Sequence, residues 1–597
     1  MSLFADLHVG RSGLQTSQEA LNVVAHNITN TDTQGYVRQQ VSQSTRDYNR
    51  LNMDITGISM KQTGLGVYIG EVRQVRDRFL DLSYREEIGR QGFYDTAYDA
   101  IQEVEEIFGE MDGATFYESM NDFWTSIEEL VKDPGSEVCQ SMFVQYAQSF
   151  SEAARNVYSS MSNYQDKLDY KVRDTVDRIN ELGKKIYDLN EKIRGIEVGG
   201  VENPNDLKDQ RNQLIDELSK CAKISYNQDF YGNVLIKLEG HDFVTMNQVN
   251  EVAYQINEDS GFVDVFWPDM AKSYVDSAGN KIYRPETAPV FNFDIKISST
   301  IDTDLGVLKS AVLARGDHRG NWTDLESDEA YDKVKESVMM NVMAEFDGLV
   351  RNVVNAVNDV LKDSAEAARL KDPSSNYLRD ADGNPIQLFT RIACDDTTRP
   401  ETVKLADVQA AGQPGSFEIN ASGQYKLVKS ISGGNKQYYD GTYTFNEETS
   451  EYISDSTGWF SVKNLAVNED LLQYPTHLGF KGPDGSMDYE TAKALETAFN
   501  EKNYKLNPEL TNPISITEYY ANLIAQLSNS GNVYKSLSEN QVLTVESVES
   551  QRQGAMGVST DEELSNMIRF QNAYNASSRF INVIDECMEH LINTLGR

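Results

Sequence analysis

The chain has 597 residues, 39% of them hydrophobic and 25% charged, which is ordinary for a globular protein but too long for a single hydrophobic core. The 55 basic and 93 acidic residues give a net charge of −38, which repels phosphate backbones, so we expect no nucleic-acid partner. No run of eighteen apolar residues occurs, and the first residues lack the basic start and apolar core of a cleaved signal peptide, so we expect neither a membrane span nor a classical secretory signal.

The first thirty residues carry a seven-residue repeat of apolar side chains. Its second row is weak, because Gly10 and Ser17 occupy two of its positions. An isolated amphipathic helix is marginal in water, so this stripe needs a partner. We therefore predict an N-terminal helix that provides an assembly interface, formed by Leu3, Leu7, Leu14, Leu21, Val24, Ile28, Asn27 and Asn30.

Long helices are also expected from about residue 79 to 194, where Pro134–Gly135 is the clearest interruption. The next stretch has β character: Val234, Ile236 and Leu238 alternate, and two later alternating runs are joined by Glu258–Gly261, which predicts a hairpin. A further apolar seam then predicts another long helix. It contains Met339, Met343, Phe346, Val350, Val353, Val357 and Val360.

Residues from about 363 to 480 again show short alternating runs between turns rich in Gly, Asn and Asp. The clearest turns are 432–435 and Asp440–Gly441. This pattern predicts a second antiparallel β insertion in a helical frame. The alternating pairs are Phe417/Ile419, Tyr425/Leu427 and Tyr443/Phe445.

The C-terminal stripe is the strongest periodic signal in the chain. Spacings of three and four residues alternate without a break, as in the a and d positions of a coiled coil. Ser559 with Glu562, and Thr560 with Glu563, mark its start as capping-box candidates. The pattern by itself allows a seam within one molecule as well as contacts between subunits. The predicted interface residues are Met567, Phe570, Tyr574, Ile581, Ile584, Met588, Leu591 and Leu595, with Ser577 in the same row.

Together these elements predict an α+β multidomain protein, with terminal α-helices that form a coiled coil, a long-helix bundle and β-rich insertion domains. The terminal region, with an N-terminal loop segment, covers 1–78 and 536–597. The bundle covers 79–225, 324–362 and 501–535. The β-rich part of the middle region covers 226–323, and a variable outer insertion covers 363–500.

No residue pattern indicates catalysis, so we expect no enzyme activity, no cofactor and no metal site. The Gly64–Gly70 run is one residue too long for a dinucleotide fingerprint. Asp380–Asn384 lacks the glycine and glutamate of a calcium loop, so it predicts a β-turn. The six histidines show no ligand spacing and the four cysteines form no CxxC pair. A group of acids predicts a solvated helix face: Glu103, Glu105, Glu106 and Glu110.

A polar block ends the first predicted helix. It reads Ala25-His26-Asn27-Ile28-Thr29-Asn30 and continues to Thr33-Gln34-Gly35-Tyr36, where Gly35 is expected to take a left-handed turn. The block resembles a signature of the bacterial flagellar rod, hook and hook-associated proteins, an Asn-Asn-Ile-Ala-Asn run followed by Thr-x-Gly-Tyr. It departs from that signature at His26 and Thr29.

Three further segments resemble the hook-associated protein 1 branch of this family. They are Gly64–Val67 leading to Val75–Leu80, Pro204–Ser219, and Gly554–Glu563 leading to Met567–Tyr574. All four blocks stand in the family order. The segment at about 363–500 matches nothing in the family, as expected for a variable, outward-facing domain.

The resemblance implies a structural subunit of the flagellum that assembles at the distal end of the hook and joins hook to filament. It would be synthesised in the cytoplasm, exported through the flagellar type III channel without a cleaved signal peptide, and reside outside the cell. The implied partners are copies of itself in a ring or helical turn, the hook protein, a second junction protein or the flagellin side of the filament, and a cytosolic export chaperone at the C-terminal helix. Neither nucleic acid nor membrane is implied. Two alternatives stay open: another axial subunit, namely a hook or distal rod protein, and a secreted adhesin or glycan-active protein carried by the β insertion.

Overall fold

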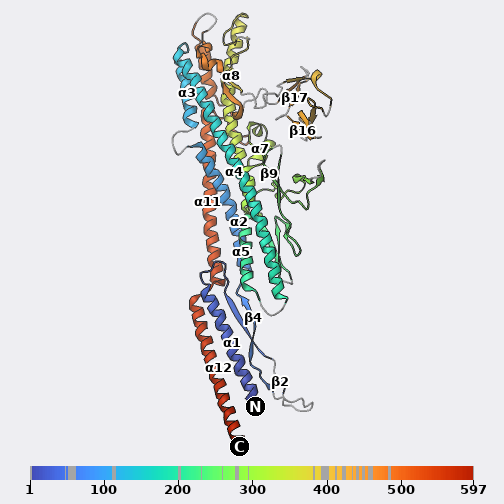
Figure 1. Cartoon of the computed structure of the whole chain (residues 1–597). Coiled ribbons are helices and arrows are strands. Elements are labelled where there is room, and N and C mark those ends of the chain that lie inside the picture. Colours follow the sequence, from blue (N-terminus) through green and yellow to red (C-terminus); the bar gives the residue numbers. More distant parts are fainter. Residues whose placement is uncertain are drawn as a thin grey trace.

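The structure is a computed structural model, and it shows an elongated molecule with a layered order along its length (Figure 1). Helices α1 (Leu3–Thr29) and α12 (Thr560–Leu595) lie at one end beside both chain termini, long helices form the body, and β-rich parts lie along one flank. This arrangement confirms the predicted α+β multidomain fold class. The structure describes residues 3–46, 49–50, 62–109, 116–198, 203–229, 232–257, 260–275, 281–293, 295–380, 383–391, 402–410, 413–419, 425–432, 435–438, 443–446, 451–454, 461–481 and 486–595.

The body is built on long amphipathic helices that bury residues at spacings of three and four. The break at Pro134–Gly135 is confirmed, and Ser136 caps the following helix through a hydrogen bond from the Cys139 N–H. The predicted seam from Met339 to Val357 is buried in the main core. The helices are α2 (Arg78–Phe108), α3 (Phe116–Lys132), α4 (Glu137–Glu197), α5 (Asn205–Cys221), α6 (Val307–Arg315), α7 (Asp328–Val334), α8 (Val338–Lys371), α9 (Glu469–Gln473), α10 (Tyr489–Asn500) and α11 (Ile516–Met556).

Helix α11 is one unbroken helix that packs along α2 as far as Met556. The domain boundary expected at residue 536 therefore falls inside this helix. The apolar repeat could not reveal this, because α11 contacts α2 along a narrow stripe and leaves side chains such as Val533 and Leu543 exposed.

The first β-rich part packs on α4 and α5 through a second core that includes Val176, Ile236 and Val263. The predicted hairpin is confirmed, with Ala253 opposite Phe266 and Ile256 opposite Val263. The strands are β5 (Ile224–Gln228), β6 (Val234–Leu238) and β7 (His241–Val244) in one sheet, the pair β8 (Ala253–Ile256) and β9 (Val263–Phe266), and the pair β10 (Ser273–Val275) and β11 (Lys281–Tyr283).

The second β-rich part begins and ends at a two-stranded stem on the bundle. In this stem, β12 (Phe389–Arg391) pairs with β19 (Leu465–Val467), and Phe389 and Val467 are buried in the main core. The outer sheet follows the order β13-β18-β17-β15-β14, with β16 on β15, and Figure 1 shows it standing away from the bundle. The predicted turns at 432–435 and Asp440–Gly441 involve positions outside the described residues. The strands are β13 (Thr402–Lys404), β14 (Phe417–Ile419), β15 (Tyr425–Ser432), β16 (Asn435–Tyr438), β17 (Tyr443–Asn446) and β18 (Glu451–Ser454).

Between α1 and α2 the chain forms a ribbon where the sequence predicted a loop segment. Strands β1 (Gln39–Thr45) and β4 (Val67–Gln74) pair antiparallel beside α1, and β2 (Asn49–Arg50) pairs with β3 (Gln62–Thr63). Sequence patterning missed this ribbon because β1 is almost entirely polar. Gly66 has a φ of +86°, and its position lies against the backbone of Val9 in α1.

Candidate assembly surface of the terminal helices

Helices α1 and α12 lie side by side in opposite directions and approach each other closely (Figure 1). A Cβ atom added to Gly10 would lie 2.8 Å from Cγ1 of Ile581, and one added to Gly13 would lie 2.8 Å from Oγ of Ser577. Gly10 and Ser17, which weaken the heptad stripe in the sequence, are both buried. The interruption of the stripe therefore marks the place where the two helices meet closely.

The predicted rows of both helices are only partly covered by this pairing. On α1, Val24 and Asn27 are buried, and Leu7, Leu14, Leu21, Ile28 and Asn30 are half-buried. On α12, Ile584 is buried, Met567, Phe570, Tyr574, Ser577, Ile581 and Met588 are half-buried, and Leu591 is exposed. The side chains of Leu3 and Leu595 lie outside the described part of the chain. The heptad seam is thus an intramolecular seam in the single chain, and most of its apolar side chains keep some accessible surface.

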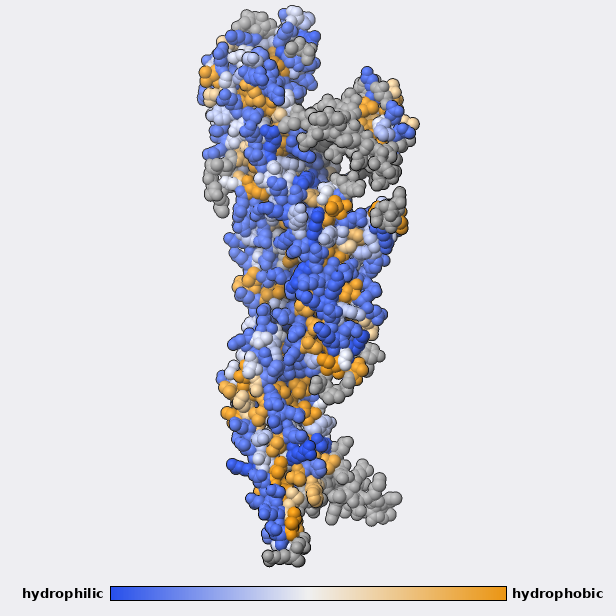
Figure 2. Space-filling model, viewed as in Figure 1, coloured by the Kyte–Doolittle hydropathy of each residue, from blue (hydrophilic) through white to orange (hydrophobic). Residues whose placement is uncertain are grey.

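The outer face of α12 is unusual for a chain with a net charge of −38. From Leu564 to Ile584 it contains no acidic residue, and Arg569 and Arg579 are its only charged side chains. Several large apolar side chains of α12 are exposed to solvent, and Figure 2 shows apolar groups along this end of the molecule. The exposed ones are Leu564, Ile568, Phe580, Val583, Leu591 and Ile592, with Phe4 on α1. Exposed apolar patches are common at the contact sites of proteins.

The polar block after α1 is explained by the contacts of Asn27. Its Nδ2 donates to the Gln39 carbonyl (2.9 Å) and to Oε2 of Glu563 (3.1 Å), and its Oδ1 accepts from the Gln39 N–H (3.0 Å) and the Tyr36 hydroxyl (2.8 Å). Asn27 is therefore fully hydrogen-bonded inside the chain, joining α1, β1 and α12. Gly35 has a φ of +78°, which confirms the predicted left-handed turn. Asn30 closes the end of α1 by donating to the His26 carbonyl.

Arg38 is a residue that sequence patterning did not identify. Its Nε donates to Glu563 (2.8 Å) and its Nη1 to Glu562 (2.7 Å), so it ties the start of β1 to the first turn of α12. The carboxylates of the two capping-box candidates are thus used for contacts with Arg38 and Asn27. Ser559 still accepts a long hydrogen bond from the Glu562 N–H, at 3.5 Å.

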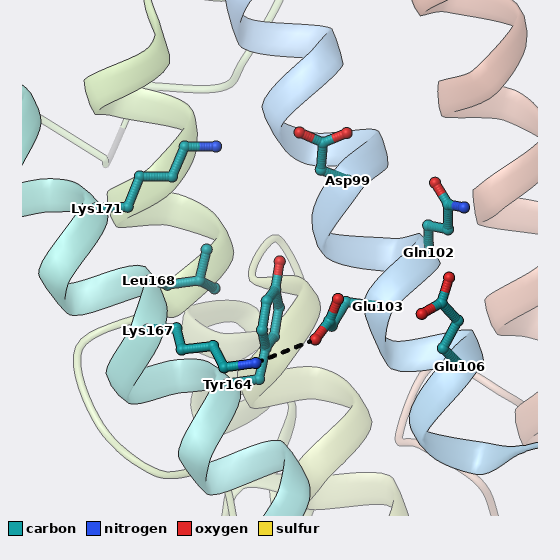
Figure 3. A pocket seen from close by; sticks show the side chains of 8 residues that line it. All are labelled: Asp99, Gln102, Glu103, Glu106, Tyr164, Lys167, Leu168 and Lys171. Carbon is teal, nitrogen blue, oxygen red and sulfur yellow. Dashed lines mark hydrogen bonds and ion pairs between the residues drawn. The ribbon is translucent and has the colours of Figure 1, made fainter.

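Outside the terminal helices, two acids of the row predicted as a solvated face, Glu103 and Glu106, line an open groove of about 390 Å³ between α2 and α4 (Figure 3). Glu105 lies instead beside Gly531 of α11. Glu103 and Glu106 face Lys167 and Tyr164 across it, and Lys167 Nζ lies 3.5 Å from Glu103. Glu110 lies outside the described residues. The acidic side chains of this groove are thus balanced by a neighbouring lysine, so their presence does not require a bound ligand.

The remaining sequence motifs also have structural explanations. Within the described residues, Asp380 begins a turn, in which its carbonyl accepts from the Gly383 N–H (3.1 Å) and its Oδ1 from the Asn384 N–H (2.8 Å). The described residues contain no group of three or more side chains suited to a metal ion. None of the helices described is both long and apolar enough to cross a membrane.

Three family models match the chain, at both ends and in the body. Residues 7–36 match "Flagella basal body rod protein", residues 101–282 match "Flagellar hook-associated protein FlgK helical domain", and residues 550–594 match "Flagellar basal body rod FlgEFG protein C-terminal". The two terminal matches cover most of α1 and α12. Both ends of the chain therefore resemble proteins of the flagellar rod, hook and hook-associated class.

Curated relatives match over nearly the whole length. Flagellar hook-associated protein 1 of Bacillus subtilis is 25% identical over 597 residues, which is 100% of this chain and 99% of the relative. The proteins of the same name from Salmonella typhimurium and Escherichia coli are 24% and 23% identical, with 98% of each chain covered. The chain is thus similar along nearly its whole length to the flagellar hook-associated protein 1 family.

A solved structure supports the fold. The flagellar hook junction protein FlgK from Burkholderia pseudomallei superposes with a TM-score of 0.50 at 14% identity, covering 80% of this chain and all of that one. The relatives are named as structural flagellar proteins. The alternatives of a hook or distal rod protein, or of an adhesin or glycan-active protein, are not favoured by these matches.

Proposed function

We propose that this chain is a structural subunit of the bacterial flagellum that assembles at the distal end of the hook and joins hook to filament. It does so by packing the α1/α12 pair against neighbouring subunits, without covalent chemistry. Each part of the fold has its own role in this proposal. The terminal helices form the inner part that assembles, the helical bundle forms the body, and the β-rich parts lie outside.

The observation that carries this proposal is the contrast between α12 and the strongly acidic chain as a whole. The overall excess of acidic residues makes copies of the chain repel one another. On α12 the stretch from Leu564 to Ile584 is free of acidic residues and exposes apolar side chains. Copies can therefore approach along this helix at a low electrostatic cost, and burial of its apolar side chains stabilises the contact by roughly 25 cal/mol per Å².

The finer parts of the proposal concern partners and location. We infer that the partners are further copies of the chain, the hook protein on one side, and a second junction protein or flagellin on the other. The same apolar face of α12 suits a cytosolic export chaperone, which would cover it before assembly. The subunit would be exported without cleavage of a signal peptide and act outside the cell.

The test is to add purified chain to isolated hooks and to image their distal ends by electron microscopy. We compare a variant with Ile568→Glu and Val583→Glu on α12 against a control with Ile419→Glu on the outer sheet, where the side chain is 64% exposed. The unmodified chain and the control should cap the hooks, and the α12 variant should not. Hooks that stay bare with the unmodified chain would refute the function, and capping by the α12 variant would refute the interface.

A further inference from the structure

The terminal helices are attached to the bundle through a narrow covalent connection. We define the terminal unit as the described residues of 3–75, namely 3–46, 49–50 and 62–75, together with 560–595. The chain crosses to the bundle twice, between β4 and α2 and between α11 and α12. The two crossings touch each other through Arg38, whose N–H donates to the Met556 carbonyl (2.9 Å) and whose carbonyl accepts from the Val75 N–H (2.9 Å). Two crossings at one place form a pivot, which by itself leaves the direction of the terminal unit free.

The first turn of α5 contacts the terminal unit away from this pivot. Asn205 Nδ2 donates to the Val72 carbonyl in β4 (3.1 Å) and lies 3.3 Å from Oε1 of Gln39 in β1. Gln39 Nε2 in turn donates to Oδ1 of Asp206 (3.0 Å). The Asp206 carboxylate also lies 3.4 Å from Nε2 of His26 in α1. One helical turn thus reaches α1, β1 and β4 together.

Asp209, at the end of the same turn of α5, is the most heavily used acceptor of this contact. Its Oδ2 accepts from the Val37 N–H (3.2 Å), and its Oδ1 accepts from Gln74 Nε2 (2.7 Å), which also donates to the Asn205 carbonyl (2.9 Å). Arg76 Nη1 lies 3.4 Å from the same Oδ1. Asn205 and Asp209 are both buried, so leaving any of these groups without a partner is costly.

The polar side chains at the start of α5 do not cap the helix, which is the usual role of such residues at this position. Asn and Asp near a helix start commonly cap its free N–H groups. At α5 the N-cap position is Pro204, and no side chain caps the helix. Asn205, Asp206 and Asp209 are instead turned toward the terminal unit. Their residue types therefore serve the contact between the two parts rather than the helix itself.

We propose that the first turn of α5, Asn205–Asp209, is an orientation clasp that fixes the direction of the terminal unit relative to the bundle. The pivot holds the two parts together, and the clasp, as a contact away from the pivot, stops the terminal unit from swinging. It keeps α1 and α12 aligned with the long axis of the bundle, as Figure 1 shows. This is a property of the single chain and does not rest on the proposed function.

The test measures the distance between the two parts in the full chain. Spin labels are attached at Asn572→Cys on α12 and Ser160→Cys on α4, both exposed positions, after the four native cysteines are replaced by alanine. One variant removes the clasp from the terminal side (Gln39→Ala with Gln74→Ala), and a second removes it from α5 (Asn205→Ala with Asp209→Ala). The matched control is Lys208→Ala, which lies on the same turn of α5 but pairs with Glu197 of the bundle.

The spin-labelled chain with an intact clasp and the Lys208→Ala control should each give one narrow distribution of distances between the two labels. Both clasp variants should give a broad distribution of distances instead, while amide exchange in α1 and the melting temperature of the bundle stay unchanged. A narrow distance retained in either clasp variant would overturn the proposal. A broad distance in the Lys208→Ala control would also overturn it. Loss of amide protection in α1 together with the narrow distance would overturn it as well, because the first turn of α5 would then be needed for folding of the terminal unit and not only for its orientation.

Discussion

The close approach of α1 and α12 makes Gly10 a sensitive position. Replacing a glycine by alanine inside an exposed helix normally stabilises it by about 1 kcal/mol, because the backbone loses less freedom on folding. At Gly10 the new Cβ would lie 2.8 Å from Cγ1 of Ile581 and 3.1 Å from Cδ1 of Phe580. The gain in helix propensity therefore competes with a steric clash.

The clash should win at Gly10. Ile581 is β-branched and has essentially one rotamer in a helix, so its Cγ1 cannot turn away, and overpacking of this kind costs about 1–3 kcal/mol. Gly10→Ala should therefore destabilise the pair by about 1 kcal/mol net. At Gly13 the obstructing atom is the Ser577 hydroxyl, which can rotate, so Gly13→Ala should be close to neutral. Gly554→Ala in α11 is the control, because nothing lies within 4 Å of its added Cβ, and it should stabilise by about 1 kcal/mol.

The assay is hydrogen exchange followed by mass spectrometry, which gives local opening free energies for α12 and for the end of α11. The expected order of stability change is Gly554→Ala above Gly13→Ala above Gly10→Ala. An alanine at position 10 that stabilises α12 as much as the control stabilises α11 would show that the two helices do not approach as described.

Two further predictions concern buried polar groups. Asn27→Ala leaves both backbone groups of Gln39 and the Tyr36 hydroxyl without their partner, so the free energy of local opening around residues 20–40 should drop by about 2–3 kcal/mol in hydrogen exchange. Asn30→Ala, the control, should lower it by less than about 1 kcal/mol. Equal effects of the two substitutions would contradict the role given to Asn27. Burial raises the pKa of Glu345 from 4.5 to about 7, so the folded chain holds this proton where the unfolded chain has lost it, and stability is lost as the pH rises from about 4.5 to about 7. Glu345→Gln removes the charge while Asn507 and Gln526 remain as partners, and urea unfolding should show a gain of up to about 3 kcal/mol at pH 8 that disappears at pH 4. A gain of the same size at both pH values would exclude titration of Glu345 as its cause.

Much of the fold was predictable because its helices are long and strongly periodic. The seam from Met339 to Val357, the strand at Val234–Leu238 and the hairpin from Ala253 to Phe266 all carry an apolar repeat, and all three are observed. The ribbon of β1 and β4 carries no such repeat. Its strands are held by pairing with each other and by contact with α1, and these are tertiary interactions that a local pattern does not contain.

The interface residues were predictable in part, for the same reason. The heptad rows located the faces of α1 and α12, but the weak positions at Gly10 and Ser17 concealed the closest contact. Arg38 and the α5 clasp could not be found from the sequence alone. Their hydrogen bonds join residues that lie more than one hundred positions apart, such as Gln74 and Asp209 or Arg38 and Glu563, and no periodicity connects such pairs.

The two-stranded stem of β12 and β19 has a consequence for how the molecule can vary. Because Phe389 lies opposite Val467, the chain leaves the bundle and returns to it at almost the same point. Closing a longer or shorter excursion between two fixed, neighbouring ends changes the free energy only slightly, by roughly 0.6 kcal/mol for each doubling of length. The outer sheet can thus be enlarged, reduced or exchanged while the helical bundle beneath it keeps its shape. This stem is therefore a suitable point for inserting a foreign domain into the subunit.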